Sequence, residues 1–367
     1  MKHVPRRVVI RSLLAGFAGL LMGPACKEKP APETTQPAAA ASAAAPASAQ
    51  PQAEDTREYK IGWSIWTGYM PFAIMEEKGF LATRAREQGV KIKLVFQKVY
   101  VDGIKAYTET KLDGVAMGSV ELLHPASQGL ASVAILVNDV SAGADGILVK
   151  NINNLKDLKG QTVMLEELTV SHYLLARALE KAGLKESDVK LKNIPGDEAG
   201  KLFVTDKAPP VVATWDPFLF KATEAGKGKV IFSSKDIPGE ILDFLVVSDS
   251  ALKRSPGLGR ALADAWFDAC AYYNDPATRP EAMRIMAKAG ETTPEDFEKM
   301  LKDTDIYGDR AKTVQFMGSD TLKDTMEKVQ RFAFEHKLIK DDRFKIGFGP
   351  GGWQKLRFDP SFIKVNK

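Results

Sequence analysis

The sequence predicts an α/β protein, built from short apolar strands that alternate with helices. The first observation is the pattern at residues 59–119, where strand-like stretches at 59–64 and 92–97 are each followed by a helical stretch and the apolar run 113–119 comes last. The second is a change of apolar period from two to 3.6 within residues 160–184. The third is length: the folded part runs to roughly 310 residues, more than one hydrophobic core usually serves, so two lobes are expected.

The stretch 160–184 predicts a strand, a turn and a helix. Residues 161–165 are apolar and strand-like, and the helix that follows has its apolar face at Leu174, Leu175, Ala178 and Leu179. The carboxyl end of a parallel strand and the start of a helix meet at the edge of an open sheet where ligands usually bind. We therefore expect a ligand-binding edge at this turn, which carries the polar side chains of Glu166, Glu167, Thr169, Ser171, His172 and Tyr173. The alternative is that the glutamates face solvent and that Ser171 only caps the helix.

A second turn of this kind carries aromatic side chains. Trp63, Trp66 and Tyr69 follow the first strand closely, with Gly68 between them. Three aromatic residues so close together are more than an exposed loop normally holds. We expect them to contribute to a binding site, and at least one of them to pack on the core instead.

Further polar residues follow other predicted strands. Residues 133–150 are expected to form paired strands that leave the first lobe near Lys150, and residues 211–215 another strand. The polar and aromatic residues at the ends of these and neighbouring strands are Ser119, Glu121, Asp139, Asp145, Trp215, Asp216 and Asp243.

The N-terminus predicts export. Residues 1–25 combine four basic residues with an apolar run at 12–22 that is too short to span a bilayer, which is typical of a signal peptide. Cys26 ends the stretch GPAC, which resembles a bacterial lipoprotein cleavage box, so lipidation at Cys26 is expected. Residues 26–56 are rich in Ala, Pro and Ser and predict a disordered tether.

Charge and cysteine content exclude several functions. The formal net charge of +4 equals the four basic residues of 1–25, so the remainder is close to neutral and no nucleic-acid partner is predicted. Cys270 lies in a helical pattern typical of a small buried thiol. The histidines are scattered, without the spacing of metal ligands, so neither a metal nor a cofactor is expected.

The order of these motifs resembles a known family. The stretches YTETKLDGVAMGS, ELTVSHYLLARALEKAGL, VVATWDPFL and IPGEILDFLVV resemble the periplasmic substrate-binding proteins of ABC importers for nitrate, sulfonate, taurine and thiamine precursors. Within that class the chain is most similar to members linked to urea or guanidine uptake. The resemblance covers about residues 59–338.

The resemblance implies a two-lobed periplasmic binding protein fold of type II, with a hinge of crossing strands and a ligand in the cleft. It implies a monomer without catalytic residues, held at the membrane by its lipid and working with a permease and an ATPase. The expected limits are 58–149 with 247–345 for lobe 1, 150–246 for lobe 2 and 346–367 for a C-terminal extension. The ligand-binding residues are expected to be Trp63, Trp66, Tyr69, Ser119, Glu121, Asp145, Glu167, Ser171, His172, Trp215, Asp216 and Asp243.

The charge of these turns predicts the kind of ligand. They contain seven acidic residues and no Lys or Arg, so a buried anion would be repelled. Guanidinium, stacked on a tryptophan with its N–H groups on Glu167 or Asp216, fits best, and urea fits less well. The alternatives are a sulfonate, taurine, nitrate or a pyrimidine thiamine precursor. An enzyme that uses His172 with Glu167, and a sensor subunit for a membrane receptor, are lower alternatives.

Overall fold

The structure, a computed structural model, describes residues 57–205, 207–341 and 344–364. The predicted signal peptide, the lipidation at Cys26 and the tether lie outside these residues. Among the helices that the structure describes, none is long and apolar enough to cross a membrane.

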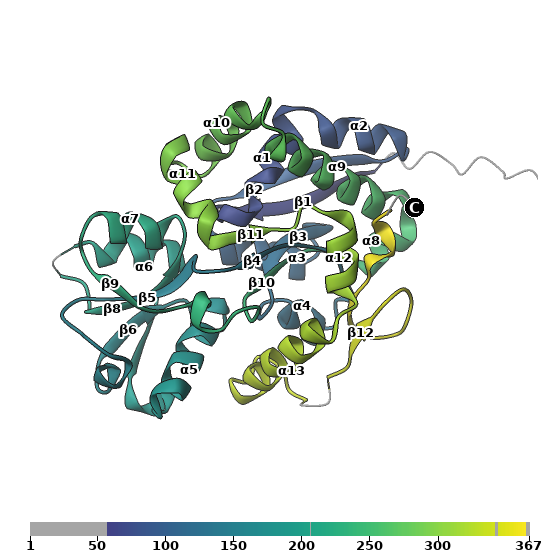
Figure 1. Cartoon of the computed structure of the whole chain (residues 1–367). Coiled ribbons are helices and arrows are strands. Elements are labelled where there is room, and N and C mark those ends of the chain that lie inside the picture. The colour runs from purple at the N-terminus through teal and green to yellow at the C-terminus, as the bar shows by residue number, and fades with distance from the viewer. Residues whose placement is uncertain (1–56, 206, 342–343, 365–367) are drawn as a thin grey trace, which may run out of the picture. The chain divides into compact units, whose positions relative to one another are not determined.

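The larger of two sheets combines strands from the beginning, middle and end of the described chain (Figure 1). Its order is β12-β13-β4-β10-β3-β1-β2, with β11 paired to β4. Strands β1, β2 and β3 are parallel, while β10 runs antiparallel between β3 and β4 and is buried along its whole length. The strands are β1 (Glu58–Ser64), β2 (Lys91–Gln97), β3 (Gly114–Gly118), β4 (Ser132–Ser141), β10 (Leu242–Ser248), β11 (Thr304–Ile306), β12 (Ile346–Phe348) and β13 (Leu356–Phe358).

The smaller sheet has the order β7-β6-β8-β5-β9. Strands β6, β7 and β8 are parallel, and β5 runs antiparallel to β8 and β9. The strands are β5 (Asp145–Val149), β6 (Thr162–Leu165), β7 (Lys190–Asn193), β8 (Val211–Trp215) and β9 (Lys229–Ser233).

Helices follow most strands and cover the sheets. On the larger-sheet side, α9 packs on α1, α2 and α10, and α12 packs on β4 (Figure 1). On the smaller-sheet side, α6 packs on β8, and α5 contacts β5 and β8. The helices are α1 (Pro71–Glu77), α2 (Phe80–Glu87), α3 (Tyr100–Thr108), α4 (Leu123–Ser127), α5 (Val170–Ala182), α6 (Gly196–Phe203), α7 (Phe218–Glu224), α8 (Asp249–Arg254), α9 (Gly257–Asn274), α10 (Arg279–Ala289), α11 (Pro294–Met300), α12 (Arg310–Met317) and α13 (Asp320–Glu335), with 3-10 turns at η1 (Thr67–Tyr69), η3 (Glu186–Asp188) and η4 (Ser234–Asp236).

The central strand-turn-helix forms as the sequence predicts. Strand β6 is followed by α5, and Thr169 is the extended residue before the helix. The Thr169 side chain does not cap the helix, and its hydroxyl instead donates to the Glu166 carbonyl at 2.7 Å. The helix ends at Gly183, whose φ of 70° is left-handed and favours glycine.

The expectation that residues 133–150 form paired strands is wrong. Strand β4 pairs with β10, β11 and β13, whereas β5 pairs with β8 and β9, so the chain passes from one sheet to the other between Ser141 and Asp145. It returns between Ser233 at the end of β9 and Leu242 at the start of β10. The sequence does not separate β4 from β5 clearly, because strands that are buried on both faces have apolar residues at nearly every position.

Ser234 ties the two crossings together. Its hydroxyl lies 2.8 Å from the hydroxyl of Ser141 and accepts from the N–H of Gly143 at 2.7 Å. The hydroxyl of Ser141 also accepts from the N–H of Asp145 at 3.1 Å. These contacts fix the first residue of β5, and Asp145 belongs to the candidate site.

The division of the strands between the two sheets differs from the expected lobe limits. Strand β5, placed in lobe 1, pairs into the smaller sheet, and residues 242–246, placed in lobe 2, pair into the larger sheet as part of β10. The expected C-terminal extension supplies β12 and β13 to the larger sheet. The division into two lobes itself stays a prediction.

Candidate ligand-binding site

A small cavity lies where the strand ends of both sheets come together. The space open to the centre of a water-sized sphere is about 20 Å³, which corresponds to one or two water molecules, so a larger ligand requires the walls to move apart. The larger-sheet side contributes the turn after β1, the first residue of α3 and the beginning of β10, and the smaller-sheet side contributes β5, β8 and the beginning of α5. The lining residues are Ile65, Trp66, Tyr69, Tyr100, Asp145, Val170, Trp215 and Asp243.

Aromatic rings form much of the cavity wall. The rings of Trp66 and Trp215, from different sheets, have centroids 6.2 Å apart at 79°. The Tyr100 ring lies 6.3 Å from that of Trp215, at 66°. Such tilted rings present π faces to a small molecule between them, and these faces attract cations.

Among the acids that line the cavity, Asp145 has no hydrogen-bond partner at normal distance on either carboxylate oxygen, although the Ser141 hydroxyl lies close enough to lower its pKa. Asp145 is the first residue of β5, opposite Trp215 in the ladder with β8, and it is 1% exposed. Burial raises the pKa of its carboxyl to about 7. A buried carboxylate without a donor is costly, so this position is suited to a ligand that brings two N–H groups side by side.

Asp243 and Asp139 form a second acidic element. The hydroxyl of Tyr69 donates to Asp243, and the Nε1–H of Trp66 lies 3.1 Å from both oxygens of Asp139. Burial raises the pKa of Asp243 to about 7. Burial and the charge of Asp243 raise the pKa of Asp139 as well.

Two further acids are buried nearby. Glu121 accepts from the N–H of Val170 at 3.2 Å, and burial raises its pKa to about 8. Burial raises the pKa of Glu166 to about 7, and its side chain accepts from the N–H of Gly196 at 3.4 Å. Among the lining residues within the described ranges there is no Lys or Arg to neutralise this charge.

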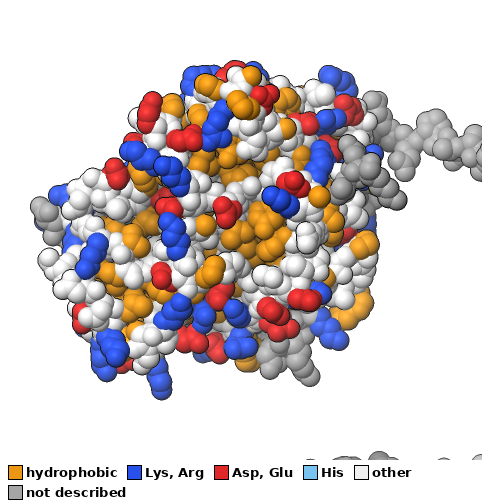
Figure 2. All heavy atoms as spheres, viewed as in Figure 1, with side chains coloured by type: hydrophobic (Ala, Val, Ile, Leu, Met, Phe, Trp, Pro, Cys, Tyr) orange, Lys and Arg blue, Asp and Glu red, His pale blue; other side chains and the backbone are white. Residues whose placement is uncertain are grey.

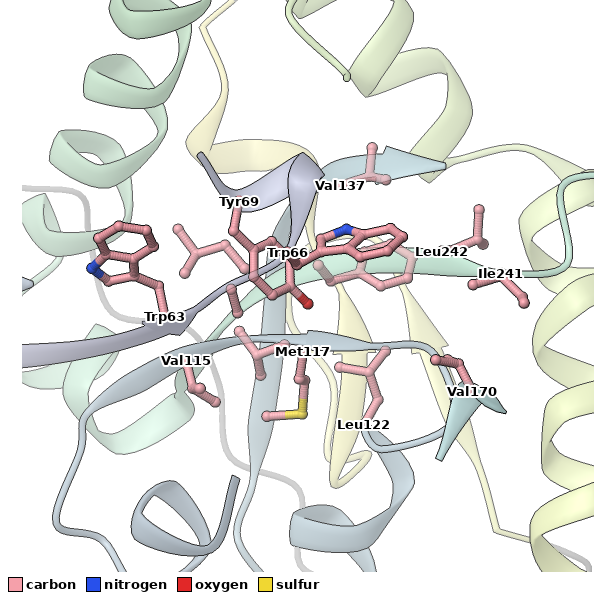
Figure 3. Packing of buried hydrophobic residues seen from close by; sticks show 14 of the residues in the cluster. Trp63, Trp66, Tyr69, Val115, Met117, Leu122, Val137, Val170, Ile241 and Leu242 are labelled. Atoms are coloured by element: carbon pink, nitrogen blue, oxygen red, sulfur yellow. The ribbon is translucent and has the colours of Figure 1, made fainter. Parts of the chain in front are cut away.

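Five of the predicted binding residues line this cavity: Trp66, Tyr69, Asp145, Trp215 and Asp243. Trp63 does not, because its ring packs 5.1 Å from Phe96 and 6.1 Å from Phe72. Figure 3 shows the Trp63 ring well apart from that of Trp66. The expectation that one aromatic residue of the turn joins the core is thus met by Trp63.

The other predicted residues have different surroundings. Glu121 and Glu167 line a separate, wider groove of about 500 Å³ beside α3 and α4. Ser119 and Ser171 are buried with unpartnered hydroxyls, away from the lining set. Asp216 accepts from the N–H of Phe220 at 2.9 Å and so caps the start of α7. His172 lies against Glu186.

Sequence reasoning missed three lining residues: Ile65, Tyr100 and Val170. Tyr100 follows β2 and opens α3, so it lies at a strand-to-helix turn of the kind from which the other binding residues were predicted. Its hydroxyl accepts from the N–H of Gly118 at 2.8 Å, which anchors it to the end of β3.

The family model described as the NMT1-like family matches residues 52–287, and the chain belongs to that family. A relative from Escherichia coli (strain K12), named "Putative aliphatic sulfonates-binding protein", is 28% identical over 189 residues, covering 45% of this chain and 59% of the relative. The match therefore spans less than two thirds of that relative's length.

Solved structures share the fold. The alkanesulfonate-binding protein SsuA from Xanthomonas axonopodis pv. citri, bound to MOPS, has a TM-score of 0.65 at 17% identity and covers 79% of this chain and 96% of that one. The desulfurization enzyme DSZB has a TM-score of 0.56 at 14% identity, covering 77% of this chain and 94% of that one. The chain thus has a mixed α/β periplasmic binding protein fold with two sheets, a fold that also occurs in an enzyme.

Proposed function

We propose that this chain is the extracytoplasmic substrate-binding component of an ABC importer, and that it captures a small nitrogen-rich polar molecule of the guanidinium or urea type. Membership of the NMT1-like family and the sulfonate-binding relative support the role in import. The observation that carries the ligand class is Asp145, a buried acid with no partner in a cavity walled by tryptophans.

Guanidinium suits this cavity in charge and hydrogen-bonding groups, and because it is small and flat it requires less widening of the cavity than an alkanesulfonate. Its two parallel N–H groups would donate to both oxygens of Asp145, while its flat face would lie on Trp66 or Trp215. A cation held against a desolvated aromatic face gains about 2 kcal/mol. Urea keeps the shape and the donors but lacks the charge, so we rank it second on physical grounds.

A sulfonate is the second candidate, and the comparisons favour it over a cation. The named relative and the structural neighbour SsuA both carry sulfonate binding in their names. In this chain a sulfonate would meet Asp145 and Asp243, which could donate to it only in their protonated form. A cavity of about 20 Å³ would also have to widen for an alkyl chain.

Calorimetric titration of the mature protein with guanidinium chloride, urea, taurine, an alkanesulfonate and nitrate separates these candidates. In a thermal-unfolding assay, a ligand at about a hundred times its dissociation constant stabilises the protein by roughly 2.7 kcal/mol. Stabilisation by taurine or nitrate, with no response to guanidinium or urea, would exclude the cationic ligand. Binding of none of the five would count against the guanidinium and urea class itself.

The role in import implies a place and partners for the chain. We place it in the periplasm, anchored through a lipid on Cys26, delivering its ligand to a permease with an ATPase. Cys26→Ser should then move the protein from the membrane fraction to the soluble fraction, whereas an unchanged membrane fraction would refute the anchor. We assign the chain no catalysis, and product formation from urea or guanidine by the pure protein would overturn that assignment.

A further inference from the structure

Two histidines and a glutamate from distant parts of the sequence meet outside the cavity. His172 Nε2 lies 3.2 Å from one carboxylate oxygen of Glu186, and His336 Nε2 lies 2.5 Å from the other. Their ligand atoms lie within 4.8 Å of one another, and within the described ranges no other such group has a metal-binding arrangement. His172 belongs to α5 and Glu186 to η3, both on the smaller-sheet side, while His336 ends α13, which contacts α12 beside β4 of the larger sheet (Figure 1).

The hydrogen bonds of His172 disfavour a metal. The N–H of Leu168 donates to His172 Nδ1 at 3.1 Å, so this nitrogen carries a lone pair. In the neutral ring the proton is then on Nε2, which lies 3.2 Å from Glu186 but is not aligned for a hydrogen bond. A metal on Nε2 would have to displace that proton, whereas a histidine ligand normally keeps its proton on the other nitrogen and donates it.

The hydrogen bonds of His336 require its own ring to be protonated and positively charged. Its Nδ1 lies 2.9 Å from the carbonyl oxygen of Phe332, and its Nε2 faces Glu186. A carbonyl and a carboxylate both accept, so both ring nitrogens donate and the ring is an imidazolium. The bond to Glu186 raises the pKa of His336, and the bonds from the two histidines lower the pKa of Glu186.

Other aromatic and charged groups surround the cluster. The Phe332 ring of α13 stacks on His336 at 4.1 Å and meets the edges of His172 and Tyr173. A separate ionic contact lies in the same interface, where Glu240 accepts from Tyr173, Arg177 and Lys328. The neighbouring charge of Glu335 further raises the pKa of His336. His336 is thus a member of the interface whose pKa is raised above the ordinary value of a histidine, chiefly by its bond to Glu186.

We propose that His172, Glu186 and His336 form a proton-controlled latch that holds α5 and η3 against α13. Because Val170, at the start of α5, lines the cavity, the latch also steadies one wall of the ligand site. The pKa of His336 is higher in the folded protein than in the unfolded chain, where it is about 6.5, so protonated His336 stabilises the fold. This stabilisation is complete below the unfolded pKa and is lost as the pH rises through the folded pKa. The latch is therefore closed below about pH 6.5 and opens as the pH rises through the raised pKa of His336.

The test needs no ligand, so its outcome is independent of the proposed function. NMR titration of the mature protein follows its three histidines, His124, His172 and His336, and should place the midpoint of His336 above the ordinary value of about 6.5. Hydrogen exchange, corrected for its intrinsic pH dependence, should be about tenfold faster in α5 and α13 at pH 9 than at pH 6.

Variants separate the latch from general stability. His336→Gln should abolish the pH effect on exchange, and His336→Arg should keep α5 and α13 protected at both pH values, because its charge does not titrate. His124→Gln, outside the cluster, is the matched control and should behave as the wild type. An ordinary or lowered midpoint for His336, or exchange in His336→Gln that depends on pH as in the wild type, would overturn the proposal. Stabilisation by zinc chloride that disappears in both His172→Gln and His336→Gln would overturn it in favour of a metal site.

Discussion

Asp139 and Asp243 lie directly opposite each other in the β4–β10 ladder, at the edge of the candidate site. Each is held by an aromatic residue of the turn after β1: Trp66 donates to Asp139 and Tyr69 to Asp243. Two buried carboxylates this close do not both ionise readily, because each charge disfavours the other. A cationic ligand of the kind proposed would therefore compete with a proton at Asp243, which lines the cavity.

The sign of the pH dependence should identify the ligand class. The carboxyls of Asp145 and Asp243, with pKa values of about 7, are partly protonated at neutral pH. A cation favours their ionised form, so its affinity should rise with pH up to about 7 and level off above, by about tenfold per unit for each proton released. A sulfonate favours the protonated form, so its affinity should fall as the pH rises through 7. Calorimetry at pH 6, 7 and 8 measures both slopes, and a flat profile would mean that these acids do not contact the ligand.

Replacing Asp145 should test the carboxylate that has no partner. Asp145→Asn removes the charge and replaces one acceptor oxygen by an NH₂ donor, so binding of guanidinium should weaken at least tenfold, about 1.4 kcal/mol, and binding of urea should weaken less because urea loses an acceptor but no charge interaction. Glu167→Gln is the control, because Glu167 is partly exposed and lines the separate groove. Equal losses in both variants, measured by calorimetry, would argue against direct contact by Asp145.

Much of this site could be predicted because it follows a local rule. Trp66, Tyr69, Asp145, Trp215 and Asp243 all lie at strand ends, and the sequence marks strand ends by a change of period. Tyr100 obeys the same rule, since it opens α3 soon after β2, but a sequence locates the start of a helix only to within one or two residues.

Other features depend on contacts that no local pattern encodes. Trp63 and Trp66 are close in sequence, but the side to which each ring turns depends on Phe72 and Phe96, which pack on Trp63. The pairing of β4 and β5 with different sheets depends on strands far along the chain. Figure 2 shows charged side chains of both signs interspersed on one face, so surface charge gives no further pointer to the site.

Gly68 should be required for the arrangement of Trp66 and Asp139. A Cβ atom at Gly68 would lie 1.9 Å from an oxygen of Asp139, so Gly68→Ala must push the acid or the turn aside. We expect a loss of about 1–3 kcal/mol in the free energy of unfolding, as for overpacking in a core, together with weaker ligand binding. Gly318→Ala is the control, since its Cβ would meet nothing closer than 3.8 Å. Urea unfolding compares the two, and equal stability of both variants would contradict the close approach.

Ser234 should control how firmly the two crossings are joined. Ser234→Ala removes its contacts with the Ser141 hydroxyl and with the N–H of Gly143, leaving that N–H without its partner. Loss of a hydrogen-bond partner by a buried polar group costs about 1–3 kcal/mol. This loss of stability should be local to residues 142–145, the segment that ends at Asp145. Hydrogen exchange should therefore quicken at Gly143 and Asp145 while the amides of β1 and β2 keep their protection. The exposed Ser250, changed to Ala, serves as the control. Unchanged exchange at Gly143 in Ser234→Ala would show that Ser234 does not fix the start of β5.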